Sequence, residues 1–169
     1  MILAVEYAPP GKRGLYGSFA PIGVCLGILL AQGVFALFSR ALFEGRAPTI
    51  YGDGEQTRDF TYVDCVVQAN LLAMEADIET GSVFNVGTGT SISINQLFAA
   101  MAHWCGSELR PVYAPAREGD VRHSLASIAK AREKLGYSPP VDWDQGLSLT
   151  MEWYRARFLA AQEVPAPRR

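Results

Sequence analysis

Residues 49–64 read TIYGDGEQTRDFTYVD, and this stretch decides how the larger part of the chain folds. A short β-rich run, Thr49 to Gly52, is stopped by a Gly-Asp-Gly turn signal. After a charged loop, Thr61 or Asp64 can begin a helix through VVQANLLAMEADI, whose apolar residues recur at helical spacing. A strand, a turn and an amphipathic helix in this order are typical of an α/β protein.

The alternation of strands and helices continues toward the end of the chain. The expected elements are a strand over 83–86, a helix with a Ser93–Gln96 capping box that ends at Gly106, an extended run over 111–113, a helix that Ser127 caps and Gly136 ends, and an amphipathic helix that Asp144 opens. We therefore expect an α/β lobe over residues 39–160, followed by a flexible tail over residues 161–169.

The composition narrows the class of protein. The chain has 169 residues, enough for one domain or for one domain with an appendage. Fifteen Lys and Arg against seventeen Asp and Glu leave a net charge of −2, which disfavours nucleic-acid binding. Cys25, Cys65 and Cys105 form no C-x-x-C pair and no zinc-type cluster with histidine. We therefore expect no metal site, no disulfide framework and a reducing, cytoplasmic location.

The first 38 residues have a different character. Residues 19–38 (FAPIGVCLGILLAQGVFALF) carry no charge, and a helix of this length would reach about 30 Å, the thickness of a bilayer core. A secretory signal is disfavoured because the basic pair Lys12–Arg13 lies late and Pro9–Pro10 precedes it. A buried helix of a soluble protein and a membrane-spanning helix both fit, so membrane association is the alternative to a cytoplasmic location.

Residues 6–38, EYAPPGKRGLYGSFAPIGVCLGILLAQGVFALF, resemble a loop and the following transmembrane helix of major-facilitator metabolite/proton symporters. The same segment holds Gly11, Gly14 and Gly17 at the spacing of a phosphate-binding glycine loop. Such a loop follows its strand directly, whereas residues 6–10, with two prolines, separate these glycines from the strand-like start of the chain. We therefore expect residues 1–38 to contain an apolar helix and no dinucleotide site.

Two charged loops stand out in the rest of the chain. They are GDGEQTRDF, residues 52–60, and AREGDVRHS, residues 116–124, and each places arginine beside carboxylates. A guanidinium group binds phosphate through two parallel hydrogen bonds, and a nearby carboxylate can orient it or accept a hydrogen bond from a ribose hydroxyl. Either these loops are solvated turns with local Arg–Asp pairs, or two arginines clamp a diphosphate.

Four blocks in order carry a specific resemblance. They are IYGDGEQTRDFTYVD (50–64), VFNVGTGTSISINQL (83–97), REGDVRHSLAS (117–127) and the Leu-Gly-Tyr-x-Pro turn (135–139). Together they resemble extended short-chain dehydrogenase/reductases, namely the NAD-dependent nucleotide-sugar epimerases, dehydratases and decarboxylases. The GDVRHS run and the late MEWY are most similar to UDP-N-acetylglucosamine 4-epimerases of surface-polysaccharide synthesis. The resemblance spans residues 39–158 and implies a truncated member, mainly the small C-terminal substrate lobe.

The resemblance also implies roles for five residues in binding a UDP-sugar. Arg58 and Arg117 match the arginines that the family places on the UDP diphosphate. Asp120 matches a carboxylate that accepts a hydrogen bond from the uridine ribose. Tyr51 and Phe60 match positions that line the nucleotide pocket, and plain core packing is the equal alternative for both.

The departures from the family pattern concern catalysis. The family's hydride chemistry needs a tyrosine four residues before a lysine, because the lysine lowers the pKa of the phenol. No tyrosine of this chain stands four residues before a lysine. Cys65 replaces a usual helix-capping Asp, and His123 is expected to be a hydrogen-bonding loop residue and not a catalyst. We therefore expect no catalytic residue here, and no bound NAD although the intact family uses it.

The sequence leaves three kinds of function open. The first is the substrate-binding portion of a UDP-sugar 4-epimerase that is inactive alone, with a decarboxylase or dehydratase as the alternative parent. The second is a membrane-anchored module that uses residues 19–38 as its span. The third is an interaction protein without catalysis, which binds a partner through an exposed apolar face. The oligomeric state does not follow from the sequence.

Overall fold

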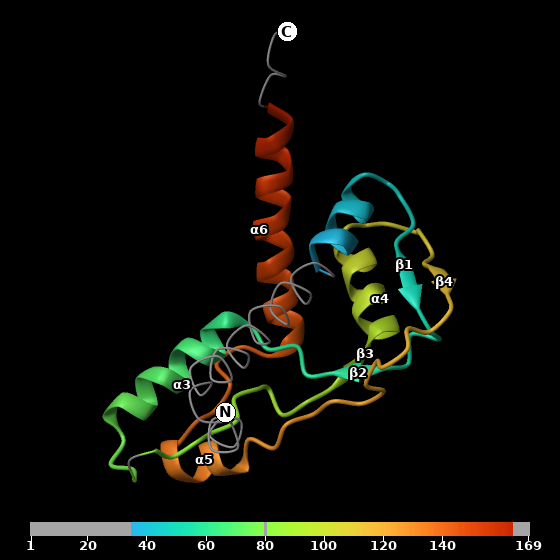
Figure 1. The fold of residues 1–169 in the computed structure, drawn as a ribbon. Coiled ribbons are helices and arrows are strands. Elements are labelled where there is room, and N and C mark those ends of the chain that lie inside the picture. Colours follow the sequence, from blue (N-terminus) through green and yellow to red (C-terminus); the bar gives the residue numbers. More distant parts are fainter. Residues whose placement is uncertain (1–34, 80, 164–169) are drawn as a thin grey trace, which may run out of the picture. The chain divides into compact units, whose positions relative to one another are not determined.

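The structure, a computed structural model, describes residues 35–79 and 81–163, with side chains up to residue 160. The chain divides into two compact units, Met1–Phe38 and Ser39–Arg169, and the elements labelled in Figure 1 belong to the second. Most of the apolar helix expected over 19–38, the glycines at 11, 14 and 17, and the end of the tail lie outside the described residues. Within the described part, every helix is too short or too polar to cross a bilayer.

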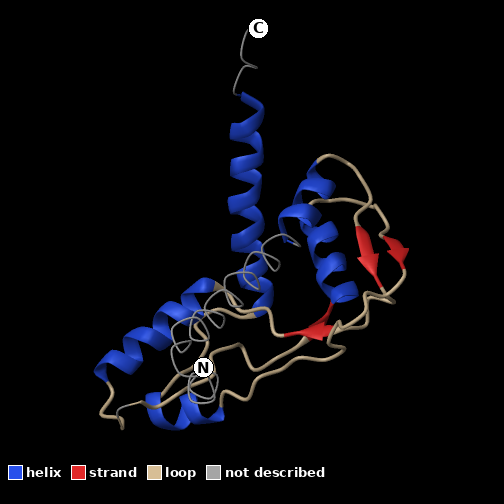
Figure 2. Cartoon of the chain, viewed as in Figure 1, coloured by secondary structure: helices blue, strands red, loops and turns tan. Residues whose placement is uncertain are grey.

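The second unit is an α/β structure, as predicted. Its elements in chain order are β1 (Thr49–Tyr51), β2 (Thr57–Arg58), α3 (Val63–Glu75), β3 (Ile92–Ser93), α4 (Ile94–Trp104), β4 (Val112–Ala114), α5 (Ala129–Leu135) and α6 (Trp143–Glu163). Helices dominate, and the strands are short (Figure 2). A further helical stretch over 35–43 precedes β1.

Two short sheets connect segments that are distant in sequence. Strand β1 pairs in parallel with β4, with Ile50 opposite Tyr113. Strand β2 pairs antiparallel with β3, with Arg58 opposite Ile92. The second pairing places the middle of the first charged loop beside the start of α4. Among the residues that the structure describes, each sheet has two strands, so its stability depends on the helices packed against it.

One cluster of buried residues joins α3, α5 and the turn after α5. Its members, which are at most 9% exposed, are Cys65, Ala69, Ile128, Ala131, Leu135, Tyr137 and Val141. Helices α3 and α5 lie side by side in Figure 1. The residues buried on them are Cys65 and Ala69 on α3 and Ala131 and Leu135 on α5. The family position that Cys65 occupies is therefore inside the core, where its thiol donates a weak hydrogen bond to the Val141 carbonyl at 3.5 Å.

A second packing contact joins α4 and α6. Leu97, Met101, Leu147 and Met151 are buried on these two helices, which contact each other. Near the far end of the contact, the Phe43 ring lies 6.4 Å from Trp104 and 5.4 Å from Phe158, between ring centroids. The buried area on each helix is apolar, so the hydrophobic effect stabilises this contact.

Helix α4 begins with the predicted capping box. The Ser93 hydroxyl accepts from the Gln96 N–H at 3.1 Å, and the Gln96 side chain accepts from the Ser93 N–H at 2.8 Å. Helix α5 also ends as predicted, at Gly136 with φ of 63°. The predicted cap at Ser127 is wrong, because the N-cap of α5 is Ile128, which makes no side-chain capping bond. The Ser127 hydroxyl accepts from the Ala129 N–H at 3.4 Å from one residue before the cap.

The strand predicted over 83–86 is wrong. These residues form no ladder with the described part of the chain, and the structure assigns them no strand. The alternation that predicted a strand is present, because Phe84 and Val86 pack against the α3–α5 cluster while Val83 is 76% exposed. The Val83 carbonyl accepts from the Lys130 ammonium at 3.0 Å. An alternating pattern predicts two faces, but a strand also needs a neighbouring strand.

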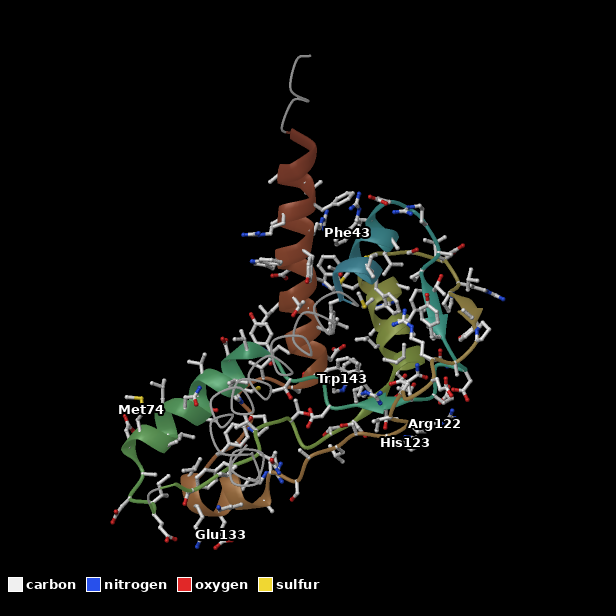
Figure 3. The ribbon with its side chains drawn as sticks, viewed as in Figure 1. Phe43, Met74, Arg122, His123, Glu133 and Trp143 are labelled. Carbon is white, nitrogen blue, oxygen red and sulfur yellow. The ribbon has the colours of Figure 1, made fainter. Side chains whose placement is uncertain are left out.

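Helix α3 turns most of its large apolar side chains outward. Val63, Val66, Val67, Leu71 and Met74 are 42–82% exposed, and Met74, labelled in Figure 3, points away from the helix. The residues buried on α3 are small, Cys65 and Ala69. The periodicity that indicates this helix therefore comes mainly from its exposed face.

The residue that opens α6 differs from the prediction. The Asp142 carboxylate accepts from the Gln145 N–H at 2.8 Å, which is the geometry of an N-cap. Asp144, the predicted opener, lies inside the first turn. Its carboxylate can only add a favourable charge near the positive end of the helix dipole.

We expect Asp142→Ala to lower the free energy of unfolding by about 1 kcal/mol, because it removes a capping hydrogen bond. The matched variant Asp144→Ala should cost only about 0.3 kcal/mol, because it loses a screened charge–dipole interaction. Urea denaturation of both variants measures the difference. A larger loss in Asp144→Ala than in Asp142→Ala would contradict the assignment of the cap.

Tyr137 is the largest fully buried side chain of the described residues, at 2% exposed. Its hydroxyl donates to the Gly87 carbonyl at 2.8 Å, across the α3–α5 cluster. Burial, and then the neighbouring Cys65, raise the pKa of Tyr137 to about 12 from an ordinary 10.0. The neutral phenol is the form that the folded protein favours.

Because the folded-state pKa of Tyr137 is raised, its contribution to stability is complete below pH 10 and is lost as the pH rises through about 12. We expect the wild type to lose unfolding free energy across this window more steeply than Tyr137→Phe. The variant should also be less stable at neutral pH by about 1 kcal/mol, because it leaves the Gly87 carbonyl unpaired. Denaturation titrations from neutral to alkaline pH test this, and parallel curves for the two proteins would refute it.

Candidate functional site

The two charged loops of the sequence lie against each other. The Thr57 N–H donates to the Arg122 carbonyl at 2.9 Å, and the Ser124 N–H donates to the Thr57 carbonyl at 3.1 Å. Thr57 and His123 thus form an isolated parallel bridge beside β2. Arg122 and His123 are labelled along this contact in Figure 3. The second loop is therefore fixed by backbone bonds to the first.

Arg58 is the central cation of this contact. Its Nη2 donates to Asp120 Oδ1 at 2.7 Å, and its Nη1 donates to the carbonyls of Thr57 at 2.7 Å and Arg122 at 3.3 Å. The Arg58 side chain is 28% exposed and the Asp120 side chain 46% exposed. The guanidinium is therefore oriented by backbone acceptors on one side and by a more exposed carboxylate on the other.

Arg117 lies on the face of an aromatic ring. Its guanidinium carbon is 3.8 Å from the centroid of the Tyr51 ring, which is the geometry of a cation–π contact. Tyr51 is 40% exposed at the end of β1, so it is no core residue. The Asp120 N–H reaches the Arg117 carbonyl at 3.4 Å. One turn of the second loop therefore carries both the stacked arginine and the carboxylate that contacts Arg58.

The structure thus connects four of the five predicted site residues in two pairs, Arg58 with Asp120 and Arg117 with Tyr51. Phe60 is half-buried in the segment between β2 and α3. His123 has the predicted hydrogen bond, between its Nδ1 and the Thr57 hydroxyl at 3.0 Å.

A second ion pair joins the same two loops. Arg122 Nη2 contacts Asp53 Oδ2 at 2.8 Å, with both side chains more than half exposed. The Glu55 N–H, and then the Arg122 guanidinium, hold the pKa of Asp53 below its ordinary value. No sequence pattern predicted this pairing. This pair ties the first turn of the site to the far end of the second loop.

Asn95 connects the first charged loop to α4 and β4. Its Nδ2 donates to the Asp53 carbonyl at 2.9 Å and to the Glu55 carboxylate at 2.6 Å. Its Oδ1 accepts from the Tyr113 hydroxyl at 3.0 Å. All three of these partners lie in or beside the β1–β4 sheet and its following turn. The amide therefore keeps the first loop at a fixed position relative to α4.

Asp59 lies beside the site, and no sequence pattern singled it out. Its Oδ1 accepts from the Thr88 N–H at 3.0 Å and from the Thr88 hydroxyl at 2.6 Å, and its Oδ2 accepts from the Gly89 N–H at 3.0 Å. Gly87 lies so close that a Cβ there would collide with the same carboxylate. The sequence pattern that could have predicted this contact is a carboxylate in one loop and a Gly-Thr-Gly-Thr run in another. Successive backbone N–H groups in such a run form a nest that binds an anion.

This nest bears directly on whether the described residues fit NAD. A dinucleotide pyrophosphate needs backbone N–H groups of a glycine-rich turn that point at it. The N–H groups of Thr88 and Gly89 point instead at the chain's own Asp59. This glycine-rich turn is therefore not free to hold a dinucleotide pyrophosphate. The residues that the structure describes contain no group of three His, Cys, Asp or Glu side chains that could hold a metal ion.

Comparison with known proteins identifies the family. The family model described as GDP-mannose 4,6 dehydratase matches residues 32–150. The chain belongs to the NAD-dependent nucleotide-sugar epimerase/dehydratase family. It is 42% identical over 123 residues to a UDP-glucose 4-epimerase of Mycolicibacterium smegmatis, which covers 73% of this chain and 39% of that protein. The resemblance seen in the four sequence blocks is confirmed at the level of the family.

Solved structures agree with this assignment. The UDP-glucose 4-epimerase of Thermotoga maritima, solved with UDP-glucose, matches with a TM-score of 0.69 and 46% identity over 74% of this chain and 40% of its own. The UDP-glucuronic acid 4-epimerase of Bacillus cereus, solved with UDP-glucuronic acid and NAD, matches with a TM-score of 0.66 and 30% identity over 72% and 38%. The chain spans about two-fifths of the length of these relatives.

We expect Asp59→Ala to lower the free energy of unfolding by about 2–3 kcal/mol, because it leaves the partly buried Thr88 donors without their acceptor. Asp64→Ala, which removes an exposed carboxylate from the first turn of α3, is the matched control and should cost less than about 1 kcal/mol. Urea denaturation measures both values. Equal, small losses would show that Asp59 does not hold the 87–90 loop.

Proposed function

We propose that residues 39–160 form the nucleotide-sugar-binding lobe of a UDP-sugar 4-epimerase of this family. The observation that carries the proposal is the turn from Arg117 to Asp120, which brings one arginine next to Tyr51 and reaches the other, Arg58. One of these guanidinium groups belongs to the turn and the other contacts it, and each can bind one phosphate of a diphosphate. Relatives in the family were solved with UDP-glucose and with UDP-glucuronic acid, which supports UDP as the nucleotide.

The five residues take distinct roles in this proposal. Arg58 and Arg117 bind the diphosphate, because arginine is always charged and its planar donors match phosphate oxygens. Asp120 accepts from the ribose hydroxyls, and Tyr51 and Phe60 offer aromatic surface to the nucleoside. Each role agrees with the chemistry of the side chain and with its partial exposure.

We also propose that this chain does not complete the reaction by itself. It has no tyrosine four residues before a lysine, so it offers no phenolate of the family type to take a proton from the sugar. Its described glycine-rich turn is occupied by Asp59 and so does not bind a dinucleotide. The affinity for a UDP-sugar is weak, because the second loop, which supplies Arg117 and Asp120, is exposed.

A dehydratase or decarboxylase activity is the alternative for the parent enzyme. The family model that matches is a dehydratase model, and the proposed diphosphate contacts do not depend on which reaction the sugar undergoes. An interaction module is the alternative outside catalysis. Helix α3 exposes large apolar side chains, of which Met74 is the most exposed at 82%. Such a face favours binding to a partner over contact with water alone.

We expect UDP to bind the full chain, and Arg58→Ala combined with Arg117→Ala to weaken that binding on the order of ten- to a hundred-fold, because each arginine supplies charge-assisted hydrogen bonds. Arg110→Ala is the matched control, because it removes an exposed arginine outside both charged loops. Calorimetric titration measures the three affinities. Equal affinity in the double variant and the control would overturn the arginine clamp.

A further inference from the structure

Each arginine of the proposed clamp is already paired with another proposed ligand-binding residue. Arg58 Nη2 contacts the Asp120 carboxylate at 2.7 Å, and the Arg117 guanidinium covers the Tyr51 ring at 3.8 Å. A carboxylate oxygen thus holds the position at Arg58 that a phosphate oxygen would take. Any anion that binds Arg58 at this position has to compete with Asp120.

The two sides of the Arg58 guanidinium differ in what holds them. Nη1 donates to the backbone carbonyls of Thr57 and Arg122, which belong to the fixed contact between the two loops. Nη2 donates to Asp120, which lies on a loop whose residues 115–127 are all exposed. Asp120 is therefore the partner that can leave, while the guanidinium keeps its place and orientation.

After it leaves Arg58, the Asp120 carboxylate finds different partners with different ligands. Bare pyrophosphate is a multiply charged anion without ribose hydroxyls, so its binding leaves this carboxylate beside a second anion and without a ribose donor. A nucleoside diphosphate carries ribose hydroxyls, which are donors that the freed carboxylate can accept from. The cost of breaking the Arg58–Asp120 pair is therefore offset for a nucleotide and not for its phosphates alone.

We propose, on the basis of the function proposed above, that Asp120 is a specificity-determining residue that makes the site select nucleoside diphosphates over bare pyrophosphate. It does so by pairing with Arg58 and by releasing that arginine to a ligand that brings a replacement donor. The residue thus acts on selectivity through competition as well as through its own contact with the ribose.

The test uses the full chain and Asp120→Asn, which keeps the shape of the side chain and removes its charge. Pyrophosphate and UDP are titrated separately at the same ionic strength. Glu118→Gln is the matched control, because it removes one negative charge two residues away on the same exposed loop. A partly exposed ion pair has a modest strength, so Asp120→Asn should bind pyrophosphate on the order of two- to five-fold more tightly than the wild type.

The ratio of the two affinities decides the outcome. We expect the preference for UDP over pyrophosphate to fall at least about two-fold in Asp120→Asn and to stay unchanged in Glu118→Gln. An unchanged preference in Asp120→Asn, with UDP still bound, would overturn this inference alone. Equal gains in pyrophosphate affinity in both variants would also overturn it, because the effect would then be general charge. Failure of the wild type to bind UDP would overturn the proposed function and the inference together.

Discussion

The backbone contact between Thr57 and the 122–124 segment is the constraint on which the site depends. Two N–H to carbonyl hydrogen bonds hold the second charged loop against β2, so that its side chains reach Arg58. Without this contact the loop over 115–127, whose residues are all exposed and form no helix, would have no defined position. Side-chain ion pairs at the surface are weak, so the backbone bonds give the geometry and the ion pairs refine it.

Two anions of the protein itself organise this region in different ways. Asp59 binds the nest of the 87–90 loop from within a partly buried position, and this bond is structural. Asp120 binds Arg58 from an exposed loop, and this bond can be exchanged. Of these two neighbouring residues, Arg58 is proposed to bind a ligand and Asp59 holds the 87–90 loop in place. Both roles therefore come from two consecutive residues at the end of one short strand.

Local signals of the sequence predicted local structure well. The Ser93–Gln96 capping box and the end of α5 at Gly136 were readable because each depends on residues within one turn. The strand over 83–86 could not be judged in this way, because a ladder needs a second strand that no local pattern supplies. Asp142 and not the predicted Asp144 caps α6. Both aspartates lie near the start of the helix and could cap it, so only the backbone geometry shows which one does. Of the candidate site, the resemblance supplied Tyr51, Arg58, Phe60, Arg117 and Asp120. How they pair, Arg58 with Asp120 and Arg117 with Tyr51, depends on loop contacts across some sixty residues.

Residues 83–86 bear on how copies of the chain behave in solution. One side of this segment is anchored, since Phe84 and Val86 lie on the α3–α5 cluster, while its backbone joins no ladder of the described residues. Backbone groups that pair with no neighbouring strand can add to a strand of another molecule. Crowding of chains during refolding therefore favours association through this segment.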